Sequence, residues 1–499
     1  MIEIDPTQAA NLINKILALP ESRTLDFKRV SGKMVGKALE TLCAFANTDG
    51  GALALGVEDP HKSSGTARFY GVQENPEAVD ELQRKLRTEF QPPIPIETFR
   101  FVHVPCTLRD GTAGHLLLAH VTKSDKVHSI VNDGTWIRLE AGNRQMTAAE
   151  ITELSYQRGV RSVESEPLPI KLELLTTDAW ARFVAARGLK SGTQAEQLCR
   201  IGLAEKMSGE ILPRLAAVLL FADEPGSLLA AHRKRADIRL MVYDGNAVTA
   251  GPTPNLRKQP KTIRGPLIDQ IDEAIRAVQD ELAQGVTLSS SGFKTRHVYP
   301  DRVMKEAIVN AVIHRDYRLN RDIFIRIFDN RIEVESPGIF LGAITLANIA
   351  SAGSKARNTL IATALREFPS PPNIDAGEGV RMMFAEMAAA HLYPPQYAQN
   401  TATAVESVTV TLLNLERPSV WDEVSDWIDR KGQIANIDLC RIAQVDTLKA
   451  SRMLKTWLEQ GVLVALANRA KRNMAYTKST LVDKPGDLFS SPTDFNSGS

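Results

Sequence analysis

The sequence predicts an α/β protein of several domains, and three observations lead to this fold class. The chain of 499 residues is long enough for about three domains of ordinary size. Along most of it, segments with apolar residues at helical spacing alternate with short strand-like runs. A polar, proline-bearing stretch, SVESEPLP at 162–169, separates the first third from the rest and is typical of a linker.

Hydrophobic content, net charge and cysteine pattern exclude several classes of protein. Hydrophobic residues make up 43% of the chain, which excludes global disorder, and the net charge of +1 confines any nucleic-acid contact to a local patch. The amino terminus lacks the pattern of a signal peptide, and the longest apolar run, 215–222, is far short of the roughly 20 residues of a membrane span. Scattered cysteines without a CxxC pair exclude a disulfide framework and suit a reducing compartment: Cys43, Cys106, Cys199 and Cys440. We therefore expect a soluble, cytoplasmic protein.

The elements of the first part are predicted in order from periodicity and turn signals. Residues 6–19 and 34–47 have the spacing of amphipathic helices, and Thr147 has the position of an N-cap before a further helix. Short apolar runs predict strands between the helices, in GGALALGVEDP, at 97–104, at 115–122 and at the end of 128–139. This alternation predicts one α/β domain over residues 1–160.

The remaining elements suggest three more modules. Helices and then a strand, DIRLMVYDG, occupy 171–245, and a long helix covers 266–284. A helix at 301–314 precedes two strands, IFIRIF and RIEVES, joined by a turn at Asp329 and Asn330. Helices run on to about 393, and 420–479 holds three helical segments and two short strands. We expect a bridging domain at 165–295, further domains at 298–415 and 418–480, and a disordered polar tail at 481–499.

Carboxylates at two points of the first domain could meet. Glu21, Asp26 and Lys28 lie close together in ESRTLDFK, and Glu58 and Asp59 follow a strand in GVEDP. Such a cluster can hold Mg²⁺ or Mn²⁺ through hard oxygen ligands, and the metal would activate a water while Lys28 neutralises a phosphate oxygen. The alternative is that these are solvated acids near the end of a helix.

These residues also carry a family resemblance. The series ESRTLDFK, CAFANTDGGALALGVED and WIRLEAGN resembles the Schlafen AlbA-like domain over residues 10–155. The resemblance implies nucleic-acid binding, and a nuclease triad of Glu21, Asp26 and Asp59, with Asp where Glu is usual before Phe27. In this interpretation Gly50 and Gly51 are structural, because they let the backbone turn tightly into the strand, and Asn47 is structural with them.

A second set of polar residues lies on one predicted helix, in EAIVNAVIHRDY at 306–317. Glu306 and Asn310 are four residues apart and therefore share a helix face. An Asn oxygen can ligate Mg²⁺ while the metal bridges phosphates, and a Glu one turn earlier can polarise an attacking water. The alternative is an amphipathic helix whose polar positions face solvent.

The surrounding sequence resembles the GHKL ATP-binding fold, in the branch found beside AlbA-like domains. The matching features over 298–415 are ExxxN, HRDY, ESPG and the glycine-rich DAGEGV at 375–380. The resemblance implies that Asn310 binds Mg²⁺, that Glu306 is the base, and that the nucleotide is contacted by Gly338, Gly377 and Gly379. It also implies a homo-oligomer. In the wider superfamily an Asp before the glycines contacts the adenine amino group, and in this sequence that stretch is Glu335-Ser336-Pro337-Gly338. No Walker A, HExxH or GxSxG signature is present.

The last module has the order of a winged helix, three helices and then a β-wing. Its predicted nucleic-acid contacts lie on the third helix and in the wing, where phosphate contacts fall in this motif: Lys449, Arg452, Lys455, Arg469, Lys471 and Arg472. The alternative is a winged helix that binds protein. The basic run at 232–235 is interpreted as a solvated loop.

Together these features predict an ATP-responsive nucleic-acid-binding protein with ATP and Mg²⁺ or Mn²⁺ as cofactors. Its first domain is a candidate metal-dependent nuclease acting on RNA or single-stranded nucleic acid. The alternatives are a nucleotide-sensing transcriptional regulator that binds DNA without cleaving it, and a scaffold that binds partners only. Convergence of Glu21, Asp26 and Asp59 separates the first two, because a nuclease requires it and a regulator does not.

Overall fold

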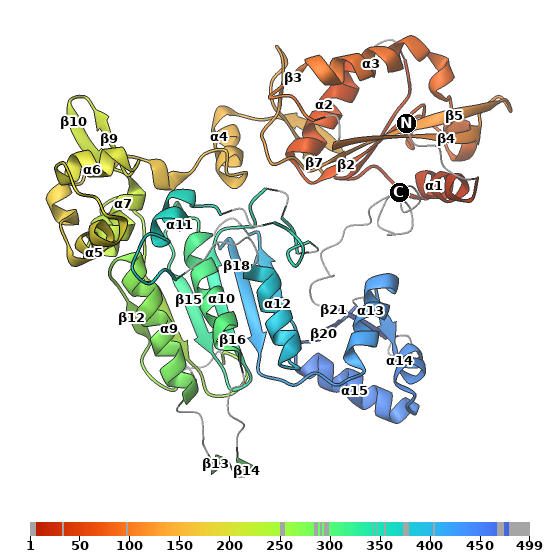
Figure 1. The fold of residues 1–499 in the computed structure, drawn as a ribbon. Coiled ribbons are helices and arrows are strands. Elements are labelled where there is room, and N and C mark those ends of the chain that lie inside the picture. The colour runs from red at the N-terminus through yellow and green to blue at the C-terminus, as the bar shows by residue number, and fades with distance from the viewer. Residues whose placement is uncertain are drawn as a thin grey trace. The chain divides into compact units, whose positions relative to one another are not determined.

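The computed structural model describes residues 6–31, 34–95, 98–249, 255–283, 288–289, 292–293, 299–342, 344–346, 348–353, 356–372, 379–402, 405–466 and 474–478. The chain forms two compact units, one ending at Arg161 and one starting at Ser162 (Figure 1). The tail 481–499 lies outside the described residues. In the described part, no helix is both long and apolar enough to cross a membrane.

A four-stranded sheet with strand order β1-β2-β5-β4 forms the centre of the first unit. The strands are β1 (Leu25–Lys28), β2 (Gly50–Leu55), β4 (Phe99–Thr107) and β5 (Ala113–Thr122). β1 and β2 are parallel, and the other pairs are antiparallel. Helix α1 (Pro6–Ala18) covers one face, while α2 (Met34–Asn47) and α3 (Pro76–Thr88) cover the other.

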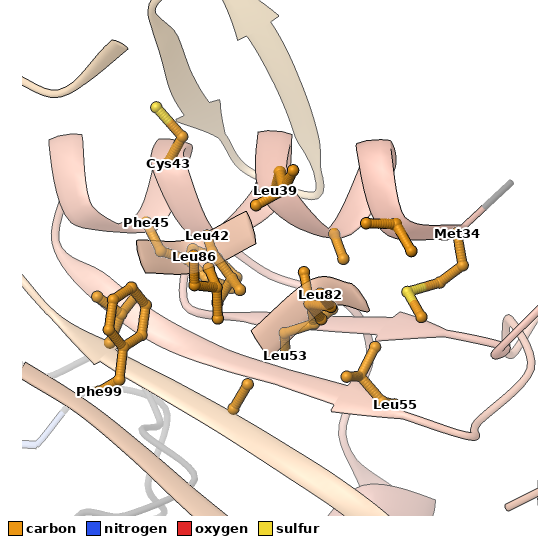
Figure 2. Close-up of a cluster of buried hydrophobic side chains, with 14 of the residues drawn as sticks. Met34, Leu39, Leu42, Cys43, Phe45, Leu53, Leu55, Leu82, Leu86 and Phe99 are labelled. Atoms are coloured by element: carbon orange, nitrogen blue, oxygen red, sulfur yellow. The ribbon is translucent and has the colours of Figure 1, made fainter. Parts of the chain in front are cut away.

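Both faces of β2 are buried, which explains its continuous apolar sequence. Leu53 and Leu55 point into the cluster formed with α2 and α3 (Figure 2), whereas Ala52 and Ala54 pack on the α1 side. The alternation of side chains along a strand therefore divides one hydrophobic run between two cores. The unit is completed by β3 (Phe90–Gln91), β6 (Ser129–Ile130), β7 (Trp136–Leu139), β8 (Gly142–Gln145) and α4 (Ala148–Gln157), whose Thr147 forms the predicted N-cap.

Asn47, at the end of α2, ties three segments of this unit together. Its amide nitrogen donates to the carbonyls of His128 and Trp136 at 2.8 and 3.0 Å, and its amide oxygen accepts from the His128 N–H at 2.9 Å. The next turn needs glycine, because Gly50 has φ +80° and a Cβ there would approach the Val121 carbonyl to 2.9 Å. The AFANTDGG motif is therefore structural in this protein.

Substitution Asn47→Ala is expected to lower the free energy of unfolding by about 2 kcal/mol, because buried backbone groups lose their partners. Asn75→Ala, which removes a single N-cap bond from α3, is the comparison and is expected to cost about 1 kcal/mol. Thermal unfolding followed by circular dichroism measures both. Equal melting temperatures for Asn47→Ala and wild type would contradict the structural role.

The second unit begins with a small helical region. It contains α5 (Asp178–Arg187), α6 (Gln194–Arg200), the hairpin of β9 (Ala204–Met207) and β10 (Glu210–Pro213), α7 (Leu215–Phe221) and α8 (Pro225–Ala230). The longest apolar run of the sequence, 215–222, includes α7, whose residues are all buried. This run is a core helix of the unit.

A six-stranded sheet follows, with strand order β12-β11-β15-β16-β18-β17. Its strands are β11 (Ile238–Val242), β12 (Lys261–Ile263), β15 (Ile323–Ile327), β16 (Arg331–Pro337), β17 (Gln396–Asn400) and β18 (Ser407–Leu413). Helices α9 (Leu267–Ala283), α10 (Asp301–Ile313) and α12 (Gly379–Ala389) lie side by side over one face (Figure 1). A short helix, α11 (Thr359–Leu365), and the hairpin of β13 (Leu288–Ser289) and β14 (Gly292–Phe293) complete this part.

This sheet corrects one sequence-based expectation. The predicted boundary between 165–295 and 298–415 separates β11 from β15, yet these strands pair in parallel from Ile238↔Ile323 to Val242↔Ile327. Because strand pairing joins segments far apart in sequence, no local composition change marks it. The second half of the predicted bridging domain is thus part of the same sheet.

The C-terminal module, over residues 421–478, contains α13 (Trp421–Lys431), β19 (Ile434–Ala435), α14 (Asn436–Ala443), α15 (Thr447–Glu459), β20 (Leu463–Ala465) and β21 (Ala475–Lys478). The strands form a sheet in the order β19-β21-β20. Asp446 caps α15, as its sequence position predicts. The core of the module also includes Tyr393 and Leu413, which lie outside it in sequence.

Candidate functional site

A pocket lies between the six-stranded sheet and the helices on it. Its walls are mostly apolar and come from α10, β16, β18, the start of α12, the segment at 338–341, Ile344 and residues within 349–353. The polar side chains are few and converge from several elements, an arrangement typical of a small-molecule site. They are Glu306, Asn310, His314, Ser336, Arg357, Arg381 and Tyr397.

The two predicted helix residues meet in this pocket. Both Glu306 and Asn310 are half-buried, and the Asn310 amide nitrogen donates to Glu306 Oε1 at 3.0 Å. This bond turns the amide oxygen of Asn310 away from the carboxylate, where it can act as a metal ligand. α10 places these residues in the pocket because its opposite face is buried against the sheet and neighbouring helices.

Two of the predicted glycines also line the pocket, and each is needed for close packing. Gly338 has φ +116°, a conformation that favours glycine, and a Cβ would lie 2.9 Å from that of Asp316. A Cβ on Gly379, at the first residue of α12, would overlap the carboxylate of Glu306. Gly377 lies outside the described residues.

Strand alternation decides which residue of the ESPG stretch faces the pocket. Glu335 is buried away from it and pairs with Arg326 at 2.6 Å and with Arg321. Although burial opposes ionisation, Arg326 and Arg321 hold the pKa of Glu335 below its usual value. Ser336 lines the pocket instead, and its hydroxyl donates to the Ala311 carbonyl at 2.7 Å. The polar group that this stretch presents to the pocket is therefore the hydroxyl of Ser336.

Sequence reasoning missed Arg357, a pocket residue that is 8% exposed. Its guanidinium donates to the carbonyls of Ile339 at 2.7 Å and His314 at 3.2 Å, and lies 3.5 Å from Asp316 Oδ2. Arg357 thus fixes the end of α10 and the segment after Gly338 to one another. These carbonyl partners are 18 and 43 residues away along the chain, so no local motif in the sequence indicates the role of Arg357.

In the first unit, Glu21, Asp26 and Lys28 lie together as predicted. Lys28 Nζ is 2.7 Å from Asp26 Oδ2, and burial together with the neighbouring Asp26 raises the pKa of Glu21 to about 7. Asp26 is only 1% exposed and also accepts a 2.9 Å hydrogen bond from Thr41. Arg138, equally buried, lies 3.5 Å from it. Although burial opposes ionisation, Lys28 and Arg138 lower the pKa of Asp26.

Asp59, the third predicted carboxylate, takes part in a local turn. Its carboxylate accepts the His61 N–H at 2.8 Å and so closes the turn after β2. Buried Arg68, which lies over the Phe27 ring at 4.5 Å, interacts electrostatically with Asp59 and Glu21. In the described part of the chain, no three acidic, histidine or cysteine side chains are placed to hold a metal ion. The three-carboxylate metal site of Glu21, Asp26 and Asp59 is therefore not assembled among the residues that the structure describes, and it stays a prediction.

On the C-terminal module, the third helix has the predicted cations at its surface. Lys449, Arg452 and Lys455 are exposed, while Ala450, Leu454 and Trp457 on the opposite side are buried. Lys455 is 3.6 Å from Glu459, an exposed pair that contributes little stability. The predicted wing residues Arg469, Lys471 and Arg472 lie outside the described residues.

Two known families match the chain, one in each of its two units. Residues 21–147 match the family described as "Schlafen, AlbA_2". Residues 320–412 match the family described as "Putative ATP-dependent DNA helicase recG C-terminal", a HATPase_c_4 domain. The chain thus combines a Schlafen AlbA-like domain with an ATPase-like domain. This composition indicates a nucleic-acid-related, ATP-linked function.

Comparisons over the whole chain do not extend this assignment of domains. No curated protein matched the sequence. One solved structure that it resembles is that of the DIP2311 protein from Corynebacterium diphtheriae, with 19% identity over 95% of this chain and 98% of that chain. The TM-score of 0.38 is too low for this likeness to support an argument.

Proposed function

We propose that this protein binds ATP in the pocket of its six-stranded sheet and uses pocket occupancy to control nucleic-acid binding by its C-terminal module. A nucleotide-sensing regulator needs a nucleotide site, a nucleic-acid surface and a connection between them. One observation carries the proposal: the helix that borders the pocket leads directly into a residue buried in the core of the C-terminal module.

That connection runs from α12 to α15. The first residues of α12, from Gly379 to Arg381, line the pocket. Beyond the end of α12, the Tyr393 hydroxyl accepts a 3.0 Å hydrogen bond from Trp457 Nε1 on α15, and both side chains are buried. Trp421 packs edge-on against each of them, with ring centroids 5.2 Å apart. A shift of α12 on nucleotide binding would reach the exposed cations of α15 through these contacts.

The pocket residues fit a metal-bound nucleotide. The glycines at 338 and 379 keep its walls free of side chains where the backbone approaches closely. The Asn310 oxygen is the group that would hold Mg²⁺, which would neutralise and orient the phosphates. Glu306, which lines the pocket beside Asn310, would orient a water near them, and the mostly apolar walls would shield the base from bulk solvent. Binding and sensing require no hydrolysis.

The α15 module is interpreted as a winged helix. Its element order and its three-stranded sheet support this interpretation, as does the exposure of Lys449, Arg452 and Lys455 on one face. The cations face outward opposite a buried core, so a polyanion can reach them without rearrangement of the fold.

ATP is expected to change the duplex-DNA affinity of the wild-type protein by about fivefold or more, the usual range of a coupling between sites. Tyr393→Phe keeps the ring but removes the acceptor of the Trp457 N–H, so this factor should fall towards one. Fluorescence anisotropy with and without ATP measures the factor, and calorimetry checks that ATP affinity is retained. Tyr243→Phe is the matched control. Tyr243 stacks on Phe328 and follows β11, which lies towards the opposite edge of the six-stranded sheet from β18 and β17. An unchanged factor in Tyr393→Phe would contradict the proposed connection.

Cleavage by the Schlafen-like domain is the second candidate function. The observation that favours it is the contact of Glu21, Asp26 and Lys28 at a half-buried site. The test is incubation with Mn²⁺ or Mg²⁺ and labelled tRNA, single-stranded DNA or duplex DNA, with EDTA as the control.

The variants separate two arrangements of such a site. Glu21→Gln leaves the ion pairs of Asp26 in place and is therefore a cleaner probe than Asp26→Asn, which leaves Arg138 buried without its counter-charge. Activity that requires Glu21 and survives Asp59→Asn would identify a two-carboxylate centre. Activity that requires Glu21, Asp26 and Asp59 would support the three-carboxylate site. Absence of cleavage by the wild-type protein would favour the regulator that binds DNA without cutting it.

A further inference from the structure

Two apolar side chains stand out on the surface of the C-terminal module. Ile437 is 70% exposed and Leu448 is 62% exposed, the largest values among the large hydrophobic residues of the described part. Each is the second residue of its helix, Ile437 in α14 and Leu448 in α15. Neither side chain belongs to the buried core of the module, so both are available to a binding partner.

Hydrogen bonds join the starts of the two helices that carry these side chains. The Asn436 amide nitrogen, at the start of α14, donates to Ser451 Oγ at 2.7 Å and to the Thr447 carbonyl at 3.2 Å. These bonds hold the first turn of α14 against the first turn of α15. Ile437 and Leu448 are each next in sequence to one of these bonded residues, at the adjoining ends of the two helices.

Cations surround this apolar pair. Exposed Arg441 follows Ile437 by four residues, and exposed Arg452 follows Leu448 by four, so each lies one helical turn behind its apolar residue. Lys449 and Lys455 add two further exposed charges on α15. Nearby acids have structural roles, since Asp438 accepts the Ala435 N–H and Asp446 caps α15. Ile437 and Leu448 therefore stand in the first turns of α14 and α15, and exposed positive charges follow along both helices.

We propose that Leu448, at the start of α15, contacts the C5-methyl group of a thymine in the major groove, and that this module therefore recognises duplex DNA rather than RNA. This inference rests on the proposed nucleic-acid binding. In helix-turn-helix proteins the first residues of the recognition helix meet base edges, and thymine is the base that offers an apolar group there. The cations behind the pair match the phosphates on either side of the groove.

Duplex RNA fits this surface poorly for two reasons. Its major groove is deep and narrow, so an α-helix does not enter it. Uracil also lacks the methyl group that would cover Leu448. A protein partner is disfavoured by charge, because two isolated apolar side chains among four cations suit a polyanion better than the apolar core of a protein interface.

The experiment compares three duplexes with the full-length protein: alternating A·T DNA, the same DNA with uracil in place of thymine, and the corresponding A·U RNA. Anisotropy at fixed salt gives the affinities. Burying one methyl is worth about 0.8 kcal/mol, so wild type is expected to bind the thymine duplex about fourfold tighter for each methyl contacted. RNA should bind no better than the uracil duplex.

Leu448→Ala should remove most of the difference between the thymine and uracil duplexes. Leu458→Ala is the matched control, because Leu458 is another exposed leucine of α15, at its opposite end. Equal wild-type affinity for the two DNA duplexes, or tighter binding to RNA, would overturn the inference. A change of oligomeric state in Leu448→Ala, seen by size exclusion without a change in discrimination, would assign the surface to a second copy instead.

The inference and the proposed function can fail separately. Thymine discrimination that persists when ATP has no effect on affinity would uphold the surface and reject the nucleotide control. An ATP effect without thymine discrimination would uphold the nucleotide control and reject the proposed contact with thymine. A protein that binds no duplex would overturn both.

Discussion

Asn310→Ala is expected to weaken binding of Mg²⁺-ATP by at least tenfold and by up to about a hundredfold, because it removes a metal ligand and leaves Glu306 without its amide partner. Isothermal titration calorimetry measures the affinity. Asn400→Ala is the matched control: the same substitution at the end of β17, at a residue that does not line the pocket.

Removal of the metal sharpens this test. In EDTA the Asn310 oxygen has no ion to hold, so the affinities of wild type and Asn310→Ala for free ATP should converge. Equal affinities in Mg²⁺ would show that Asn310 is no metal ligand. An equal difference with and without Mg²⁺ would show that Asn310 acts by shaping the pocket.

Replacement of Lys449, Arg452 and Lys455 by Gln is expected to weaken duplex-DNA binding by about a hundredfold near physiological salt. Each lost phosphate contact should also make the slope of log affinity against log salt shallower by about 0.9. Affinities at several salt concentrations give both quantities. The matched control replaces three exposed lysines of the helical region by Gln: Lys171, Lys190 and Lys206.

The structure favours this triple variant over deletion of the module. Tyr393 and Leu413 are buried in the core that the module forms, and deletion would expose them. A fall in affinity after deletion would then report a damaged sheet as well as a lost surface. An unchanged salt slope in the triple variant would make the module a protein-contact domain.

The sequence determined the features that depend on neighbours a few residues apart. Helical periodicity predicted α1, α2, α9 and α10 to within about two residues, and the i, i+4 spacing placed Glu306 and Asn310 on one face. The turn of AFANTDGG and the N-caps at Thr147 and Asp446 also followed from local chemistry. Such features depend on residues within one or two helical turns of each other. They can therefore be predicted from a short stretch of sequence.

Only the tertiary structure decided which distant residues meet. Strand pairing brought β11 into the sheet of β15, and strand alternation turned Glu335 away from the pocket and Ser336 into it. The Asp59 carboxylate accepts a hydrogen bond within its own turn, and the described residues contain no group of three such side chains placed to hold a metal ion. The contact between Tyr393 and Trp457 spans 64 residues. These outcomes depend on how whole elements pack and on which buried charges find partners, and neither property is present in any short stretch of sequence.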